Sequence, residues 1–185
     1  MDFSKPQFQN SHLAQVTGLT SDTLQTWANR GLLTSSTPGR VGSGQRRLYS
    51  AADVIHVRLI QKLMAFGLPV SVASEICSAR LNDETVEFIY QLHSQFNDKI
   101  LMCISRTSSG YKAEYVNMSR GQAVSLEGAA ASVLEPGRPE DSPVVRACEA
   151  LATAVTQRGA ALTVNLGELI GETIETLGTV VTDAI

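Results

Sequence analysis

The chain has 185 residues, 43% of them hydrophobic and 18% charged, and its formal net charge at pH 7 is −3. This length allows one good core or a small domain with a second modest one, and no segment approaches the roughly 20 apolar residues of a membrane span. The charge is divided unevenly, because residues 1–66 hold seven Lys and Arg against three Asp and Glu, whereas residues 67–185 hold eight against fifteen. A basic head of net +4 on an acidic body of net −7 is typical of a DNA-reading module carried by a domain that avoids DNA.

The first clear pattern is a pair of short helices. Residues 10–17 predict one helix, which Gly18 ends with the tight turn that helix-turn-helix units need. Thr20 predicts the N-cap of a second helix over residues 21–29. Gly31 ends this second helix and returns the chain to the core.

The second helix has two distinct faces. Leu24, Trp27 and Ala28 share its inner face. The outer face is small and polar, and such a face can enter a major groove and touch base edges. An ordinary solvated helix is the alternative. The outer residues are Ser21, Asp22, Gln25, Thr26 and Asn29.

A basic hairpin follows. Residues 34–45 are almost all turn-forming, and residues 46–49 are extended. We predict a hairpin tipped by Gly42-Ser43-Gly44 whose cations bind phosphates or a minor groove. A flexible loop with solvated charges is the alternative, and the position beside a helix-turn-helix favours the hairpin. The cations are Arg40, Arg46 and Arg47.

Two further helices follow the hairpin. Ser50 and Asp53 form a capping-box pattern for a helix that continues to Phe66. Gly67 stops it, and Pro69 starts another helix. The spacing predicts these inward residues: Val54, Val57, Ile60 or Gln61, and Met64 in the first helix, and Val72, Ile76 and Ala79 in the second.

These motifs, in this order and spacing, resemble the N-terminal winged helix-turn-helix domain of the MerR family of bacterial transcriptional regulators, over roughly residues 10–80. The matching pieces are Gly18-Leu19-Thr20, Thr23-Leu24, Gly31-Leu32-Leu33, Arg46-Arg47-Leu48-Tyr49-Ser50 and Asp53. The resemblance implies a dimer that distorts promoter DNA to aid or block RNA polymerase.

The chain departs from the family pattern on the second helix. The family's Arg-Tyr-Tyr-Glu is replaced by Gln25-Thr26-Trp27-Ala28, which removes a cation and two phenols that commonly touch DNA. Gln25 can still pair bidentately with an adenine edge. Trp27 is either a DNA contact or a core residue. The family's wing Tyr-Arg is replaced by Arg46-Arg47, which restores positive charge.

The second half departs from the long coiled-coil helix of MerR-like proteins. Residues 82–97 predict a helix, residues 99–105 a buried strand and residues 111–118 a return strand, so a β-hairpin replaces the coiled coil. The alternative is that the apolar run after residue 99 simply extends the helix. Residues 135–143 are rich in proline, glycine and charge and predict an exposed linker or loop.

The last helix signal covers residues 165–185, with Asn165 as its cap and a broad apolar stripe. Its two interpretations are a dimerisation helix and a helix that packs on its own domain. The residues that we assign to dimerisation are Leu166, Ile170, Ile174, Leu177 and Val181.

Catalytic and metal-binding patterns are not found in the sequence. Cys77, Cys103 and Cys148 are widely spaced and form no C-x-x-C pair, which favours reduced thiols in a cytoplasm and leaves a metal site only by a chance meeting across a dimer. The sequence holds neither a phosphate-binding loop nor a nucleophile elbow. We therefore expect no enzyme activity and no cofactor.

The sequence predicts a mainly α protein, with a winged helix-turn-helix DNA-binding domain at 1–80 and a C-terminal α+β region with a terminal amphipathic helix at 81–185. We expect a cytoplasmic homodimeric regulator whose partners are an inverted-repeat DNA site, a second copy and RNA polymerase. The alternatives are an excisionase-like architectural factor of a phage or mobile element, and an adaptor whose degenerate helix-turn-helix binds protein; a ligand-sensing domain at 82–185 is compatible with the first reading. The expected DNA-binding residues are Ser21, Gln25, Thr26, Trp27, Arg40, Arg46, Arg47 and Tyr49.

Overall fold

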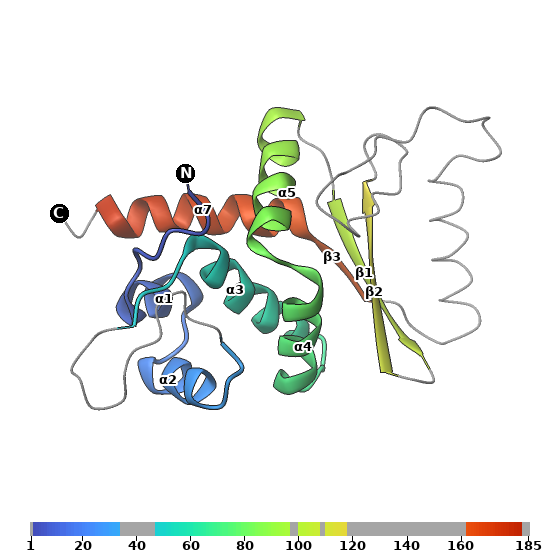
Figure 1. The fold of residues 1–185 in the computed structure, drawn as a ribbon, viewed down its shortest axis with the longest axis horizontal. Coiled ribbons are helices and arrows are strands. Elements are labelled where there is room, and N and C mark those ends of the chain that lie inside the picture. The colour runs from blue at the N-terminus through green and yellow to red at the C-terminus, as the bar shows by residue number, and fades with distance from the viewer. Residues whose placement is uncertain (1, 34–46, 97–99, 108–109, 118–161, 183–185) are drawn as a thin grey trace. The chain divides into compact units, whose positions relative to one another are not determined.

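In the computed structural model, the described residues are 2–33, 47–96, 100–107, 110–117 and 162–182 (Figure 1). Internal contacts divide the chain into two compact units. The first consists of residues 1–87 together with residues 169–185, and the second of residues 88–168. The predicted hairpin over residues 34–46 and the predicted linker at 135–143 lie outside the described residues.

The amino-terminal helices begin and end where local chemistry requires. Gly18 ends the first helix with a left-handed φ of +70°, and the hydroxyl of Thr20 accepts a hydrogen bond from the Thr23 N–H at 3.2 Å. Ser50 and Asp53 form the predicted capping box, with reciprocal bonds of 3.1 and 2.8 Å. These predictions are confirmed. The helices are α1 (Asn10–Thr17), α2 (Ser21–Asn29), α3 (Ala51–Ala65) and α4 (Val70–Arg80).

Helix α3 is the central element of the first unit, because residues on most of its faces are buried. Leu63 is fully buried while Met64 is 39% exposed, so the prediction that Met64 faces inward is wrong. On α4 the expected face is also displaced, since Ala73 and Cys77 are buried whereas Ala79 is exposed. A periodic stripe identifies residues that share a face, but tertiary contacts decide which face is covered.

The second half contains the predicted helix and hairpin. Helix α5 (Asp83–Phe96) is followed by β1 (Ile100–Thr107) and β2 (Gly110–Asn117), which pair antiparallel from Ile100 opposite Asn117 to Thr107 opposite Gly110. The predicted strand after residue 99 is confirmed, and the alternative that this apolar run extends the preceding helix is excluded. A third strand, β3 (Leu162–Asn165), which the sequence did not predict, pairs antiparallel with the other edge of β1.

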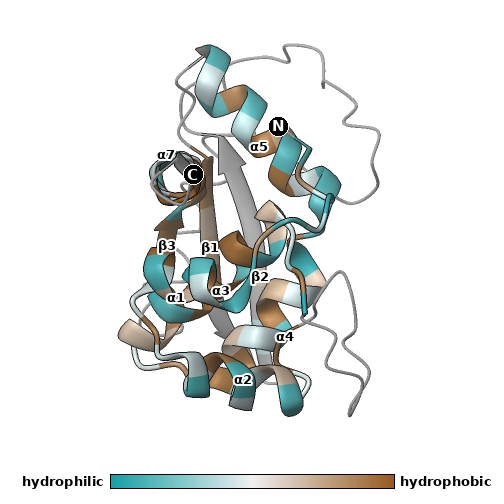
Figure 2. Cartoon of the chain, turned by 90° about the vertical axis from the view of Figure 1, so that its left-hand side faces the viewer, coloured by the Kyte–Doolittle hydropathy of each residue, from teal (hydrophilic) through white to brown (hydrophobic). Residues whose placement is uncertain are grey.

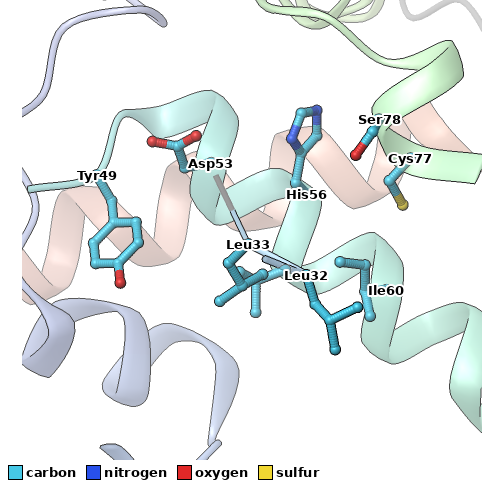
Figure 3. A pocket seen from close by; sticks show the side chains of 9 residues that line it. Leu32, Leu33, Tyr49, Asp53, His56, Ile60, Cys77 and Ser78 are labelled. Carbon is cyan, nitrogen blue, oxygen red and sulfur yellow. The ribbon is translucent and has the colours of Figure 1, made fainter. Parts of the chain in front are cut away.

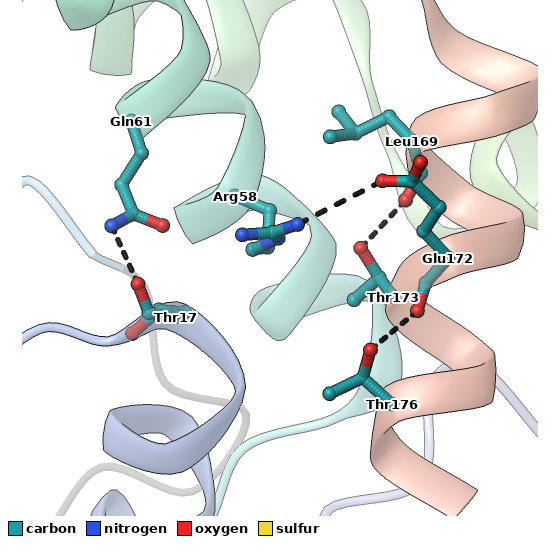
Figure 4. A network of polar contacts seen from close by, with 7 residues as sticks. All are labelled: Thr17, Arg58, Gln61, Leu169, Glu172, Thr173 and Thr176. Atoms are coloured by element: carbon teal, nitrogen blue, oxygen red, sulfur yellow. Dashed lines mark hydrogen bonds and ion pairs between the residues drawn. The ribbon is translucent and has the colours of Figure 1, made fainter.

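Helix α7 (Leu166–Thr182) begins at the predicted cap, where the Asn165 side chain accepts from the Glu168 N–H at 3.3 Å. From residue 169 onward it belongs to the first unit, with its Glu172 carboxylate 3.9 Å from the Arg58 guanidinium of α3 (Figure 4). That ion pair is long and partly exposed, and it contributes little to stability. The apolar residues of α7 attach it more firmly, since Ile170 and Leu177 are both 0% exposed.

The expected fold class is confirmed: the described chain is mainly α, with an amino-terminal helix-turn-helix and a later α+β region that ends in a helix. None of its described helices combines the length and the apolar character that crossing a membrane requires. The functional division at residue 80 stays a prediction, and the contact units differ from it by including the carboxyl-terminal helix with the helix-turn-helix.

Candidate nucleic-acid interface

Helix α2 presents a polar face to solvent. Its hydrophilic residues are visible along the helix in Figure 2, and the exposed side chains are those of Ser21, Asp22, Gln25, Thr26 and Asn29. Ser21, Gln25 and Asn29 follow each other at intervals of four residues, so they form one stripe along the helix. This stripe contains hydroxyl and amide groups, which hydrogen-bond base edges without carrying a charge.

The inner face of α2 fixes the helix to the core. Leu24 is 0% exposed and Trp27 only 7%. Beyond the helix, Gly31 has a left-handed φ of +71°, which allows the Leu32 N–H to donate to the Trp27 carbonyl at 2.9 Å and the Gly31 N–H to donate to the Ala28 carbonyl at 3.2 Å. The structure therefore decides between the two roles considered for Trp27: it is a core residue, and its ring does not face solvent.

Two side-chain amides fasten the turn between α1 and α2. The Gln61 amide of α3 donates to the Thr17 carbonyl at 2.8 Å, as Figure 4 shows, and the Asn10 amide donates to the Ser21 carbonyl at 3.4 Å. The first bond joins α3 to the end of α1, and the second joins the start of α1 to the start of α2. The polar face of α2 is consequently held at a fixed orientation on the first unit.

Tyr49 anchors the segment that follows residues 34–46. Its backbone pairs with Phe8 through bonds of 2.8 and 2.9 Å, and its side chain is only 1% exposed. Burial raises the pKa of the Tyr49 phenol, which the nearby positive charge of Arg47 partly opposes. The phenol therefore stays protonated at neutral pH. In this structure Tyr49 supports the site from beneath and does not offer its side chain to DNA.

Arg47 lies half-buried beside the end of α2, where its guanidinium donates to the side-chain oxygen of Asn29 at 2.9 Å. Arg40 and Arg46 fall outside the described residues. Arg30, an exposed cation at the C-cap of α2, was not among the predicted site residues. Its signal in the sequence was a cation placed directly after the predicted recognition helix.

A small cavity lies next to the buried Tyr49 side chain, and its lining includes Leu33, Tyr49, His56 and Cys77 (Figure 3). Its volume of about 10 Å³ is room for roughly one water, which is too small for an organic effector. Burial raises the pKa of the Cys77 thiol to about 12, so this thiol stays protonated at neutral pH and is a poor nucleophile. Within the described ranges, no three His, Cys, Asp or Glu side chains gather as a metal site would require.

Comparison with known proteins assigns this part of the chain to a family. Residues 8–80 match the family model described as MerR HTH family regulatory protein. These residues contain α1 to α4, the exposed stripe of α2 and the Arg47–Asn29 bond. Residues 8–80 are a MerR-type helix-turn-helix domain. The resemblance read from the sequence is thereby confirmed for this part of the chain.

Proteins similar to the MerR-type domain include uncharacterized HTH-type transcriptional regulators of Mycobacterium bovis and Mycobacterium tuberculosis. Each is 30% identical to this chain over 61 residues, which is 33% of this chain and 27% of the relative. The chain thus matches about a quarter of the length of these relatives, and the likeness concerns the domain alone.

Most of the α7 side chains that we expected to form a dimer are buried within the chain itself. Leu166, Ile170 and Leu177 are each 0% exposed, whereas Ile174 is half-buried and Val181 is 37% exposed. A partner cannot reach the three buried side chains unless α7 first detaches. This burial favours the alternative that the helix packs on its own domain, and a dimerisation role for α7 stays a prediction.

Proposed function

We propose that this protein binds double-stranded DNA through the MerR-type domain and regulates transcription. The observation that carries the proposal is the exposed polar stripe of α2 within a segment that matches the MerR regulatory family. A helix of nine residues is about 13 Å long and about 10 Å wide with its side chains, which fits a major groove about 12 Å wide.

Within this proposal, the residues of the stripe have different roles. The Gln25 amide can donate to and accept from the edge of an adenine, so Gln25 contributes sequence preference. Ser21 and Thr26 offer hydroxyl groups to bases or phosphates. Trp27 and Tyr49 hold the backbone in place from the core, since neither side chain is accessible.

Positive charge near α2 supplies affinity that does not depend on sequence. Arg47 lies at the carboxyl end of the helix, joined to Asn29, and we assign it a phosphate contact. Each phosphate neutralised by a cation releases counterions, so binding weakens as salt rises. Arg40 and Arg46 are proposed to add contacts from the segment between α2 and α3.

We further propose that two copies bind an inverted repeat and act on RNA polymerase at a promoter. Helix-turn-helix dimers place their recognition helices about 34–36 Å apart, one DNA turn from half-site to half-site. Because Leu166, Ile170 and Leu177 are buried within the chain, we propose that the dimer interface uses surfaces other than the covered face of α7. Native mass spectrometry of the full chain reports the oligomeric state, and a monomer at micromolar concentration, with and without DNA, contradicts the dimer.

The test of DNA binding uses fluorescence anisotropy with the full chain and a duplex taken from upstream of its own coding region, against a random duplex of equal length. Gln25→Ala should reduce the preference for the first duplex by about fivefold or more, because a bidentate base contact contributes about 1–3 kcal/mol. Arg47→Ala should weaken binding to both duplexes and lower the slope of log K against log salt by about 1.

Lys62→Ala is the matched control, since Lys62 is an exposed cation on α3 outside the proposed site. It removes the same unit of charge and should leave both affinities within about twofold. Equal losses in the Lys62 and Arg47 variants would mean that only net charge matters. Failure of the unaltered protein to bind either duplex at low salt contradicts the proposed function.

A further inference from the structure

One side-chain hydrogen bond joins two separate segments of the candidate interface. The guanidinium of Arg47 donates to the side-chain oxygen of Asn29 at 2.9 Å, although 18 positions separate the two residues along the chain. Asn29 is the last residue of α2, and Arg47 stands two residues before the buried Tyr49. The bond therefore joins the outer stripe of the recognition helix to the cation that is proposed to bind phosphate.

Both ends of this bond are attached to fixed backbone. On one side, the bonds from Gly31 and Leu32 to the last turn of α2 fix the backbone around Asn29. On the other side, Tyr49 pairs with Phe8, and Ser50 caps α3. Because the anchoring backbone is fixed on both sides, the Asn29 amide restricts the rotamers of an otherwise long and flexible side chain.

The chemistry of Asn29 suits the positioning of a cation that must still bind an anion. Arginine has five N–H donors, and Asn29 uses one of them. The amide oxygen carries no charge, so it orients the guanidinium without neutralising it, whereas a carboxylate there would compete with a phosphate for the same cation. The positive charge of Arg47 also lies close enough to the buried Tyr49 phenol to lower its pKa, against the effect of burial.

We propose that Asn29 is a positioning residue, which holds the Arg47 guanidinium in place for a DNA phosphate at the carboxyl end of α2. This inference rests on the proposed DNA binding and assigns Asn29 a part that acts through Arg47. A side chain ordered before binding loses less conformational entropy on contact, and the expected gain in affinity is about three- to tenfold.

The experiment is a double-mutant cycle in the full chain, comprising the unaltered protein, Asn29→Ala, Arg47→Ala and the double variant. Affinities for the upstream and random duplexes are measured over a salt series. Asn29→Ala should weaken binding to both duplexes about three- to tenfold and leave the salt slope unchanged, because the number of phosphates contacted stays the same. In the Arg47→Ala background the same substitution should change affinity by less than about twofold.

The possible results distinguish a failure of the role assigned to Asn29 from a failure of the proposed DNA binding. If Asn29→Ala is without effect, or weakens binding equally in both backgrounds, Asn29 does not act through Arg47 and the inference fails, while DNA binding by the unaltered protein still stands. If the unaltered protein binds neither duplex, both fall together. Trp27 fluorescence, which comes from the core under α2, verifies that each variant is folded.

Discussion

Substitution of Leu177 by alanine tests whether α7 is part of the unit that contains the helix-turn-helix. The Leu177 side chain is 0% exposed, and truncation of a fully buried leucine costs about 2–5 kcal/mol, through lost burial and the cavity that remains. With a loss of about 3 kcal/mol and a slope of about 2 kcal/mol per M urea, the unfolding midpoint should fall by about 1.5 M.

The assay is urea unfolding followed by tryptophan fluorescence. Trp27 is the single tryptophan of the chain and lies buried on α2, so its signal reports the first unit and not the sheet. Val181→Ala is the matched control on the same helix, because Val181 is 37% exposed and its truncation should cost about 0.5 kcal/mol or less. Each protein is measured at two concentrations that differ tenfold.

Two results would refute the reasoning. An unchanged Trp27 transition in Leu177→Ala would show that α7 does not pack on the first unit. A loss that appears only at the lower protein concentration would show that Leu177 faces a second copy, as the dimerisation hypothesis requires.

Substitutions at three further positions test local features of the fold, all by the same fluorescence assay. Ser50→Ala removes the cap of α3 and should cost about 1 kcal/mol, and an unchanged midpoint would contradict the role of the capping box. Gly18→Ala should cost about 1 kcal/mol through backbone strain alone, because φ is +70° and no atom lies within 4 Å of an added Cβ; Gly18→Asn should cost less, since asparagine tolerates this conformation. Burial raises the pKa of Cys77 from 9.0 to about 12, so the unfolded chain ionises this thiol first and the stability it contributes is lost as the pH rises from about 9 toward 12. The midpoint should therefore fall more between pH 8 and pH 10 in the unaltered protein than in Cys77→Ala, and an equal fall would contradict the assignment.

Local signals in the sequence predicted the element boundaries well. Thr20, Ser50 and Asn165 are caps in the structure as predicted, because a cap depends on one side chain and the backbone within three residues of it. The short apolar run after residue 99 identified the buried strand β1, and the alternation of residues 111–118 identified its partner β2. Strand β3 was missed because its four residues are stabilised by pairing with β1, a partner some 60 positions away.

What covers each helix could not be predicted from the sequence. Met64 and Ala79 satisfy the helical spacing of a buried stripe, yet both are exposed, since the elements packed around α3 and α4 select other faces. The same limit applies to the site. The outward direction of Ser21 and Gln25 followed from periodicity, whereas the burial of Tyr49 depends on the pairing of its backbone with the distant Phe8.

The membership of α7 in the first unit has a consequence for the order of events during synthesis. The two parts of that unit are separated by residues 88–168, which a ribosome adds in about 4–16 s at 5–20 residues per second. During this interval the nascent chain already carries α1 to α4 while α3 still lacks its carboxyl-terminal neighbour. We expect ribosome-bound chains stalled before residue 169 to be more sensitive to protease than the released protein. Helix α7 thus completes the unit whose amino-terminal helices are synthesised first.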